Sequence, residues 1–566
     1  MQRNRAWCND ILQERWGKWV WVVALAALCW AAVGCGGRDR SCDGCGTLVI
    51  AATGEPSSLF PPLVFETVGR DISDQIYERL AYLEPGQAPI DTAAYRPGLA
   101  VRWERRDSLT WRFYLRPGAV WQDGVPMTAE DVRFSFAAFA DPVLDALART
   151  TIEGRLAAFV VDSTTVDVRF AEPSPEQLYD ATYHVRIIPR HIWQDVPVES
   201  WPTDTMLARI IGSGPYRLAE WRRPEFLILE SWPNASRAPG IPRVVWRFGE
   251  DPLAVVNLVL SHEADLLEAA GGPAQVAQLA EDPAVRLESY PSAVYGFLGF
   301  RVLDSAGRPH PVLGDREVRR ALTMGLDRSG IARSVFGPET FVPPGPMSRL
   351  LWIWDDSSAQ VHFDTLAAGR MLEARGWVRG SDGIRVRNRR TLAFEVLVPS
   401  TSRTRRQLAE AAQAMWRGLG VDVTIAAVDF PVFQERLGSG RFDSYIGAWL
   451  DEPSPRGISD QWTRAGWGVL NYGRYANPVF DSLVGRASRE PEVEAARMLW
   501  RDAIRILNAD APAVFLYNPT NVAAVHRRLR GVRLDPYSWL GYLGEWSVDP
   551  SQALARDSQA AAVGPE

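Results

Sequence analysis

Apolar and polar positions alternate at several different spacings along the chain, and each spacing predicts an element. In residues 111–115, Trp111, Phe113 and Leu115 alternate with two polar side chains. This period of two predicts a strand with one apolar face. The Pro-Gly pair that follows predicts a turn, because proline presets one backbone angle and glycine supplies the next. Residues 47–53, TLVIAAT, predict a short buried strand followed by a Gly/Pro-rich loop.

The polar residues of the next stretch have local structural explanations. Thr128 is a good N-cap, and Asp131 stands at the spacing of a capping box. Asp123 precedes a glycine in a second turn signal. We therefore do not interpret these carboxylates as a catalytic pair. Residues 71–83 predict a further helix upstream.

Helices followed by short loops and strands recur in the second half of the chain. Residues 316–327 carry apolar side chains at helical spacing, with Asp315 as a plausible N-cap. Residues 405–419 form a second stripe that Gly420 ends, and a strand follows. Residues 492–507 predict a third helix before the apolar segment AVFLY. This alternation is typical of layered α/β architecture.

The N-terminal 34 residues have the pattern of a signal peptide. Basic residues precede an apolar run at positions 20–33, which is shorter than the roughly 20 residues that a membrane span needs. Small residues stand directly before Cys35, which predicts cleavage there and lipidation of Cys35. An uncut membrane anchor and a plain secretory signal are the alternatives.

All five cysteines lie within the first 45 residues, so the folded body has none. An exported domain without cysteine avoids stray disulfides. Cys42 and Cys45 form a CxxC pair, for which a redox or metal role is possible. A metal site would need two further ligands, and we interpret residues 35–45 as a flexible tether.

Length and charge narrow the class of protein. A chain of 566 residues is too long for one hydrophobic core, so several domains are expected. Hydrophobic residues make up 46% and charged residues 23%, the balance of an ordinary globular protein. The formal net charge of −6 does not indicate a nucleic-acid-binding protein, which would need a basic patch to neutralise phosphates.

Several segments, in order, carry a family resemblance. The stretch YRPGLAVRWERRDSLTWRFYLRPGAVWQDGVPMTAEDVRFSF is followed by IIPRHIW, GSGPYRLAEW, DREVRRALTMGLDRSGIARSVFG and YIGAWLDEPSP. Together they resemble the substrate-binding proteins of bacterial ABC importers, in the peptide/nickel-binding branch called family 5, which includes dipeptide- and oligopeptide-binding proteins. One such match would be weak, but this many in the right order is specific.

The resemblance implies an α/β protein with the type II periplasmic-binding-protein fold: two hinged α/β lobes and an extra small domain. The implied divisions are the signal peptide 1–34, the tether 35–45, lobe I at 46–80, 196–290 and 505–545, the extra domain 81–195, lobe II at 291–504, and a tail at 546–566. The extra domain then contains the stretch at 111–131, which implies a scaffold role for it.

The resemblance also implies binding without chemistry. The chain is expected to be a monomer outside the cytoplasm, held to the membrane through Cys35, that captures a small ligand, a peptide above all, and delivers it to permease subunits of an ABC importer. No enzyme activity or cofactor is expected. No metal is expected either, and nickel in particular is not, since only six histidines exist and none are paired at ligand spacing. Oligosaccharides and other small molecules remain open as ligands.

The candidate ligand contacts follow from what a peptide needs. In the family an acidic residue shortly after a tryptophan holds the ligand's amino group, and here Asp451 or Glu452 follows Trp449. Arg403 and Arg405 are candidates to bind the ligand carboxylate. The alternative is that they are solvent-exposed residues at the start of a helix. Two interpretations stay open for Trp449, Trp462 and Tyr472: they line pockets for ligand side chains, or they belong to the hydrophobic core. The loop containing Thr53, Gly54 and Glu55 is expected to give backbone contacts.

Two other classes of function compete with import. A receptor of the same fold would hand its ligand to a sensor, and neighbouring permease and ATPase genes would argue against it. An exported hydrolase is the other alternative. The sequence contains neither the HExxH motif nor the GxSxG elbow.

Overall fold

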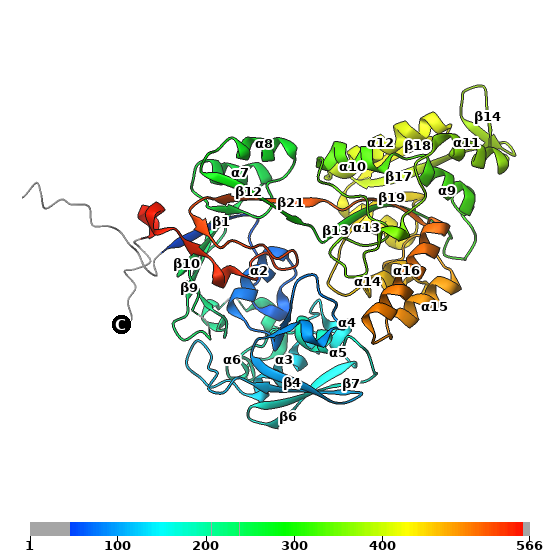
Figure 1. The fold of residues 1–566 in the computed structure, drawn as a ribbon. Coiled ribbons are helices and arrows are strands. Elements are labelled where there is room, and N and C mark those ends of the chain that lie inside the picture. Colours follow the sequence, from blue (N-terminus) through cyan, green and yellow to red (C-terminus); the bar gives the residue numbers. More distant parts are fainter. Residues whose placement is uncertain (1–45, 205, 237, 558–566) are drawn as a thin grey trace, which may run out of the picture.

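The computed structural model describes residues 46–204, 206–236 and 238–557, which form two α/β lobes and a smaller sheet domain (Figure 1). We call these units lobe I, lobe II and the extra domain, each defined by its main sheet. The predictions for the signal peptide, Cys35, Cys42 and Cys45 lie outside the described residues. Within the described ranges, no helix combines the length and the apolar character that crossing a bilayer requires.

Lobe I is built on a seven-stranded mixed sheet with β1 near its centre. The first five residues of β1 are buried, as in a strand covered on both faces, and the predicted strand at 47–53 is confirmed. The strands in spatial order are β12 (Val285–Pro291), β21 (Thr520–His526), β11 (Leu266–Leu267), β1 (Thr47–Thr53), β10 (Arg243–Gly249), β9 (Phe226–Ser231) and β8 (Tyr216–Arg222). The main helices are α2 (Thr67–Ile76), α7 (Pro252–Leu260) and α8 (Pro273–Ala280).

Lobe II is built on a five-stranded mixed sheet with helices on both faces. Neighbouring residues of β17, Val396 and Leu397, are fully buried in two separate hydrophobic clusters, because successive side chains point to opposite faces. The strands in spatial order are β18 (Asp422–Val428), β17 (Ala393–Pro399), β19 (Ser444–Leu450), β13 (Val294–Phe300) and β20 (Ala513–Tyr517). The longer helices are α9 (Arg316–Met324), α10 (Arg328–Phe336), α11 (Thr365–Ala374), α12 (Arg403–Leu419), α13 (Phe430–Ser439), α15 (Pro478–Ala487) and α16 (Val493–Asp510).

The extra domain is an antiparallel sheet covered by helices. Its strands in spatial order are β4 (Ala100–Asp107), β5 (Thr110–Leu115), β7 (Thr165–Phe170) and β6 (Leu156–Asp162), and its helices are α3 (Ala129–Ala140), α4 (Arg149–Ile152), α5 (Gln177–Tyr183) and α6 (Arg190–Trp193). The predicted strand at 111–115 and the capping box of Thr128 and Asp131 are confirmed. The side chain of Asp131 accepts the N–H of Thr128 at 2.8 Å.

The helix predicted at 71–83 is wrong at both ends. Helix α2 begins at Thr67 and ends at Ile76, and Tyr77 has an extended backbone. The chain then forms β2 (Ala81–Leu83), which pairs with β3 (Tyr95–Pro97). The apolar residues after position 76 pack through this strand pairing, so tertiary contacts override the helical spacing.

The chain crosses between the lobes twice, at residues 292–293 and 518–519. Asn518, which is fully buried, joins the two crossings, because its side-chain amide donates to the carbonyls of Ser292 at 2.8 Å and Val294 at 2.7 Å. The return to lobe I predicted at residue 505 is too early. That position lies inside α16, and β20 after it still belongs to the sheet of lobe II.

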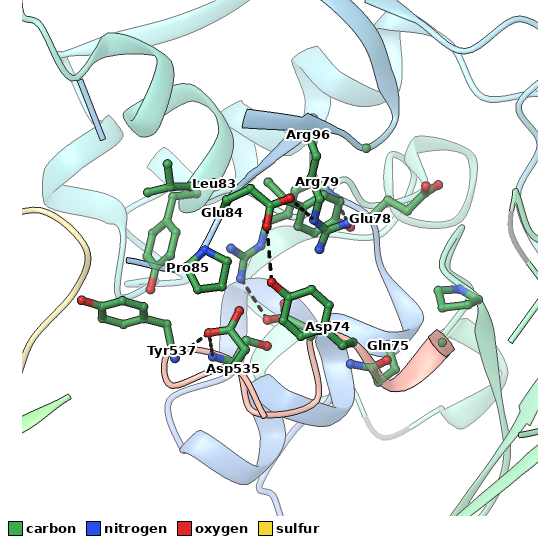
Figure 2. Close-up of a pocket in the computed structure, with 18 of the residues that line it drawn as sticks. Asp74, Gln75, Glu78, Arg79, Leu83, Glu84, Pro85, Arg96, Asp535 and Tyr537 are labelled. Carbon is green, nitrogen blue, oxygen red and sulfur yellow. Dashed lines mark hydrogen bonds and ion pairs between the residues drawn. The ribbon is translucent and has the colours of Figure 1, made fainter. Parts of the chain in front are cut away.

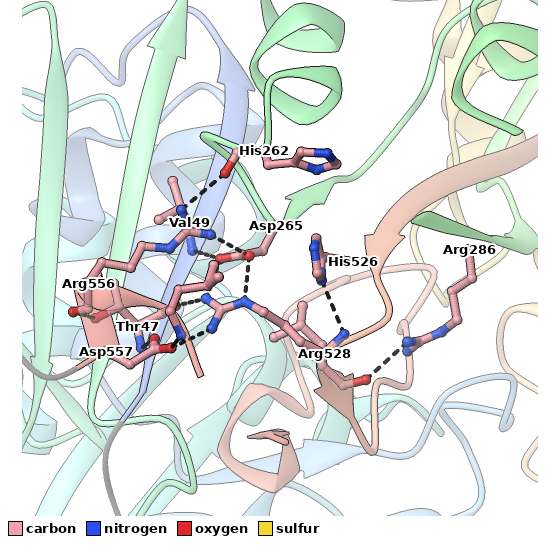
Figure 3. Close-up of polar contacts among 11 residues, drawn as sticks. Thr47, Val49, His262, Asp265, Arg286, His526, Arg528, Arg556 and Asp557 are labelled. Carbon is pink, nitrogen blue, oxygen red and sulfur yellow. Dashed lines mark hydrogen bonds and ion pairs between the residues drawn. The ribbon is translucent and has the colours of Figure 1, made fainter. Parts of the chain in front are cut away.

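The C-terminal segment through residue 557 belongs to lobe I, so the tail predicted from residue 546 is wrong up to that point (Figure 3). Arg528 has no exposed surface and forms ion pairs with Asp265 at 2.7 Å and with Asp557 at 2.8 Å. Asp557 also accepts the N–H of Thr47 at 2.8 Å. These three charged residues and Thr47 form what we call the Arg528 cluster, which joins the start of β1 to the C-terminal segment.

Lobe II also contacts the extra domain directly. Arg456 of lobe II forms ion pairs with Glu176 and Asp180 at α5. The hydroxyl of Ser454 donates to Glu176 at 2.8 Å. We call this set the Arg456 contact. It brings α5 next to the loop that follows β19.

Candidate ligand-binding site

Two cavities lie where residues of the three units meet. The larger has a volume of about 410 Å³ and is lined by α2, by the β2–β3 hairpin, by the segment 533–545 and by Pro453 of lobe II (Figure 2). The smaller has a volume of about 120 Å³ and is lined by Pro61, Val64, Arg70, Ser73, Phe139, Leu147, Ala148, Thr151, Tyr183, His184, Arg186 and Glu452. Arg70 and Tyr183 line both cavities, so the two are neighbours.

Helix α2 supplies one wall of both cavities because it is amphipathic. Ile72 and Ile76 are fully buried in the core of lobe I. Asp74 lies on the cavity side and pairs with Arg79 at 2.9 Å (Figure 2). Asp74 also pairs with Arg186 at 2.7 Å. Burial disfavours the charged carboxylate, but Arg186 and Arg79 outweigh this effect and lower the pKa of Asp74 to about 2. Asp74 is therefore a fixed negative charge that belongs to the wall.

The two predicted carboxylates after β19 have different surroundings. Asp451 accepts the backbone N–H of Ser348 at 2.6 Å, and its own N–H donates to the carbonyl of Ala293. Asp451 therefore holds two loops together. Glu452 is exposed on the cavity surface, and its carboxylate is 3.5 Å from the hydroxyl of Tyr179. Among the described residues, Glu452 has no cation within ion-pair distance.

The electrostatics of Glu452 suit a cationic ligand group. Desolvation by the surrounding protein raises the pKa of Glu452, and the positive charges of Arg70 and Arg456 offset part of this rise. A ligand ammonium beside the carboxylate would favour its charged form. Glu452 is thus a partly desolvated carboxylate that is accessible from the smaller cavity and has no ion-pair partner within 4.0 Å among the described residues.

Asp451 predicts a pH effect on stability. Burial raises the pKa of Asp451 to about 7, whereas an unfolded aspartate titrates near 3.9. Between these values the folded state binds more protons than the unfolded state, so this group makes folding less favourable as pH rises from about 4 to about 7. Asp451→Asn cannot titrate and still accepts the Ser348 N–H. We expect the unfolding temperature of the variant, relative to the wild type, to rise between about pH 4.5 and about pH 8. An unchanged difference across this range would contradict the assignment.

The other predicted contacts lie outside both cavities, and Glu452 alone of the ten predicted contacts lines one. Trp449 and Tyr472 are half-buried and stack on each other, with ring centroids 6.5 Å apart. Trp462 is 5% exposed and packs edge-on against Phe297 and Phe515 in the core of lobe II. We therefore assign Trp462 to the core.

The predicted arginines and the loop after β1 lie elsewhere on the surface of the two lobes. Arg403 is exposed at the first position of α12, and Arg405 is half-buried over the ring of Phe433. Thr53 and Gly54 are exposed at the end of β1. Glu55 forms an ion pair with Arg223 at 3.5 Å.

Sequence reasoning missed the lining residues of α2 and α5. Arg70 and Ser73 lie on α2, and Tyr183 and His184 lie at the end of α5. The predicted helix start at residue 71 left Arg70 outside the helix. A signal for α5 was present in the aromatic side chains of Tyr179 and Tyr183, which stand at i and i+4 and stack at 4.7 Å.

Comparisons with known proteins agree with this architecture. Residues 94–468 match the family described as bacterial extracellular solute-binding proteins, family 5 Middle. The chain is 28% identical over 510 residues to Protein XP55 of Streptomyces lividans, with 87% of each chain covered. It is 27% identical over 476 residues to the periplasmic murein peptide-binding protein MppA of Escherichia coli, covering 77% of this chain and 82% of that one.

A solved structure with a similar fold is the oligopeptide-binding protein AppA of Bacillus subtilis in complex with a nonapeptide. The TM-score is 0.71 at 21% identity, covering 89% of this chain and 99% of that chain. This likeness confirms the predicted type II periplasmic-binding-protein fold.

Proposed function

The chain belongs to family 5 of the bacterial extracellular solute-binding proteins, and from this premise we propose that it captures a peptide between its lobes and delivers the peptide unaltered to an ABC import permease. The observation that carries the proposal is Glu452, a partly desolvated carboxylate in a cavity lined by all three units, without an ion-pair partner in the part of the chain that the structure describes. The relatives named above as murein peptide-binding and oligopeptide-binding proteins support a peptide as the ligand.

The ligand's ammonium group would bind Glu452. A charge-assisted hydrogen bond between an ammonium and a carboxylate is about twice as strong as a neutral one, and desolvation strengthens it further. The hydroxyl of Tyr179 lies 3.5 Å from the carboxylate and would help to orient it. Because Asp451 is bonded to the backbone of Ser348, we assign the ammonium to Glu452 and not to Asp451.

Ligand capture would proceed by closure of the lobes. The two crossings at 292–293 and 518–519 are the covalent links between the main sheets. The Arg456 contact would form on closure, since it joins lobe II to the extra domain beside Glu452. A ligand shifts this equilibrium only to the extent that it binds the closed state better than the open one.

The cellular setting that we propose rests on the sequence. Cleavage before Cys35 and lipidation of Cys35 would hold a monomeric binder outside the cytoplasm, close to its permease. The proposal assigns no chemical step to the protein. Hydrolysis of a bound peptide by the purified protein would overturn this part.

A thermal-shift screen tests the proposed function. The full chain is melted with di- to pentapeptides, with sugars and with metal ions as separate arms. A peptide at 100 times its dissociation constant should stabilise the folded state by about 2.7 kcal/mol and raise the unfolding temperature. If sugars raise the unfolding temperature and peptides do not, the peptide assignment is wrong. The proposal that the protein binds a small ligand would still hold.

A further inference from the structure

The smaller cavity contains polar groups that no described residue satisfies. Ser73 is 1% exposed, and its hydroxyl is buried without a hydrogen-bond partner among the described residues. The Nε2 atom of His184 is likewise buried and unsatisfied, with the nearest carboxylate oxygen, of Asp180, at 3.9 Å. Buried polar groups are nearly always hydrogen-bonded, so these two point to a ligand group.

Arg70 adds to the same cavity a positive charge that has no close ion-pair partner. Its guanidinium has no carboxylate within 4.0 Å among the described residues. The nearby arginines differ, since Arg79 and Arg186 are both paired with Asp74. Asp71, the residue after Arg70, accepts the indole N–H of Trp539 at 2.8 Å. The closest partners of these two carboxylates are therefore other residues, although the charge of Arg70 also favours the ionised forms of Asp71, Asp74 and Glu452.

The position of Arg70 in α2 increases the positive potential. It lies in the first turn of the helix, where no acidic residue is present, and Glu66 at the N-cap makes no capping hydrogen bond. A cation near a helix N-terminus is unfavourable because the backbone dipole is positive there. An anion bound at this place would relieve the repulsion.

His184 would act in this cavity as a neutral donor. Burial, and then the positive charges of Arg456, Arg79 and Arg186, lower the pKa of His184 to about 3. The imidazole is therefore uncharged at neutral pH and carries one N–H. A ring with that N–H on Nε2 would donate to an acceptor in the cavity.

We propose that Arg70, with the hydroxyl of Ser73 and the ring of His184, binds a carboxylate that the ligand carries a few bonds from the ammonium held by Glu452. The inference rests on the proposed function, because it takes Glu452 as the ammonium site. Arg70 and Glu452 line the same cavity of about 120 Å³, so the two ligand charges must be close. The carboxylate is either the side chain of an acidic first residue or the terminal carboxylate of a very short peptide.

Isothermal titration of the full chain with matched peptides tests the inference. Glu-Ala-Ala is compared with Gln-Ala-Ala, and Ala-Ala with its C-terminal amide. We expect the carboxylate of one of these pairs to tighten binding about tenfold to a hundredfold, as for a hydrogen bond to a charged group. Arg70→Gln should remove that preference, so that the two peptides of the pair bind the variant with equal affinity. Ser73→Ala should reduce the same preference without changing the net charge.

The outcomes separate this inference from the proposed function. Arg133→Gln, in an exposed pair with Glu130 on α3, is the control and should preserve the preference. Equal affinities within both pairs, or an equal loss for all peptides in Arg70→Gln, would overturn the inference while peptide binding stands. Failure of every peptide to bind the wild type would overturn both.

Discussion

Replacing Glu452 by glutamine should lower peptide affinity by about thirtyfold or more. Removing one partner of a desolvated, hydrogen-bonded charge pair costs about 2–5 kcal/mol, and each 1.4 kcal/mol is a factor of ten. Glutamine keeps the shape of the side chain and a carbonyl acceptor, so the loss reports the charge. Isothermal titration with a peptide identified by thermal shift gives the measurement.

Asp451→Asn is the matched control, because it removes a neighbouring carboxylate that already bonds the Ser348 N–H. We expect its affinity for the same peptide to stay within about threefold of the wild type, a difference of less than 1 kcal/mol. If instead Asp451→Asn abolishes binding and Glu452→Gln does not, the ammonium site belongs to Asp451.

Replacing Arg528 by methionine should destabilise lobe I by about 3–5 kcal/mol, the usual effect of removing one partner from a buried ion pair. Arg528 has no exposed surface, and its loss would leave Asp265 and Asp557 buried with less compensation. Methionine fills much of the space, so the effect reports the lost charge and hydrogen bonds. Urea unfolding at neutral pH, followed by circular dichroism, measures it.

Arg530→Met tests whether loss of any arginine in this part of the sequence lowers the stability of lobe I. Arg530 lies two residues away and pairs with Asp549, but its side chain is 61% exposed. Exposed ion pairs contribute about 0–1 kcal/mol, so this variant should unfold close to the wild type. If Arg528→Met and Arg530→Met lose similar stability, burial of the Arg528 cluster is not the cause of the destabilisation.

Individual helices and strands could be predicted from the sequence where a local signal was strong. Asp315 caps α9 and Gly420 ends α12 in a left-handed conformation, both as expected. The helix expected at 71–83 failed because strand pairing decides the structure after residue 76. Strand pairing with a segment distant in sequence cannot be predicted from the local spacing of apolar residues.

The candidate site could be predicted only in part. Glu452 could be predicted as a ligand contact because it follows a recognisable tryptophan at the end of β19. Arg70 and His184 are more than 100 positions apart in sequence and meet Glu452 only through packing of the three units. Trp462 is a pocket candidate by residue type, but its packing against Phe297 of β13 and Phe515 of β20 makes it core.

Asn518 has a consequence for motion between the lobes. Its side chain bonds two carbonyls on the other crossing, and its backbone N–H and carbonyl bond those of Phe341. One crossing therefore cannot bend without carrying the other. The two crossings should therefore act as one hinge with a single favoured axis. Movement of either crossing would then rotate a whole lobe as a rigid body.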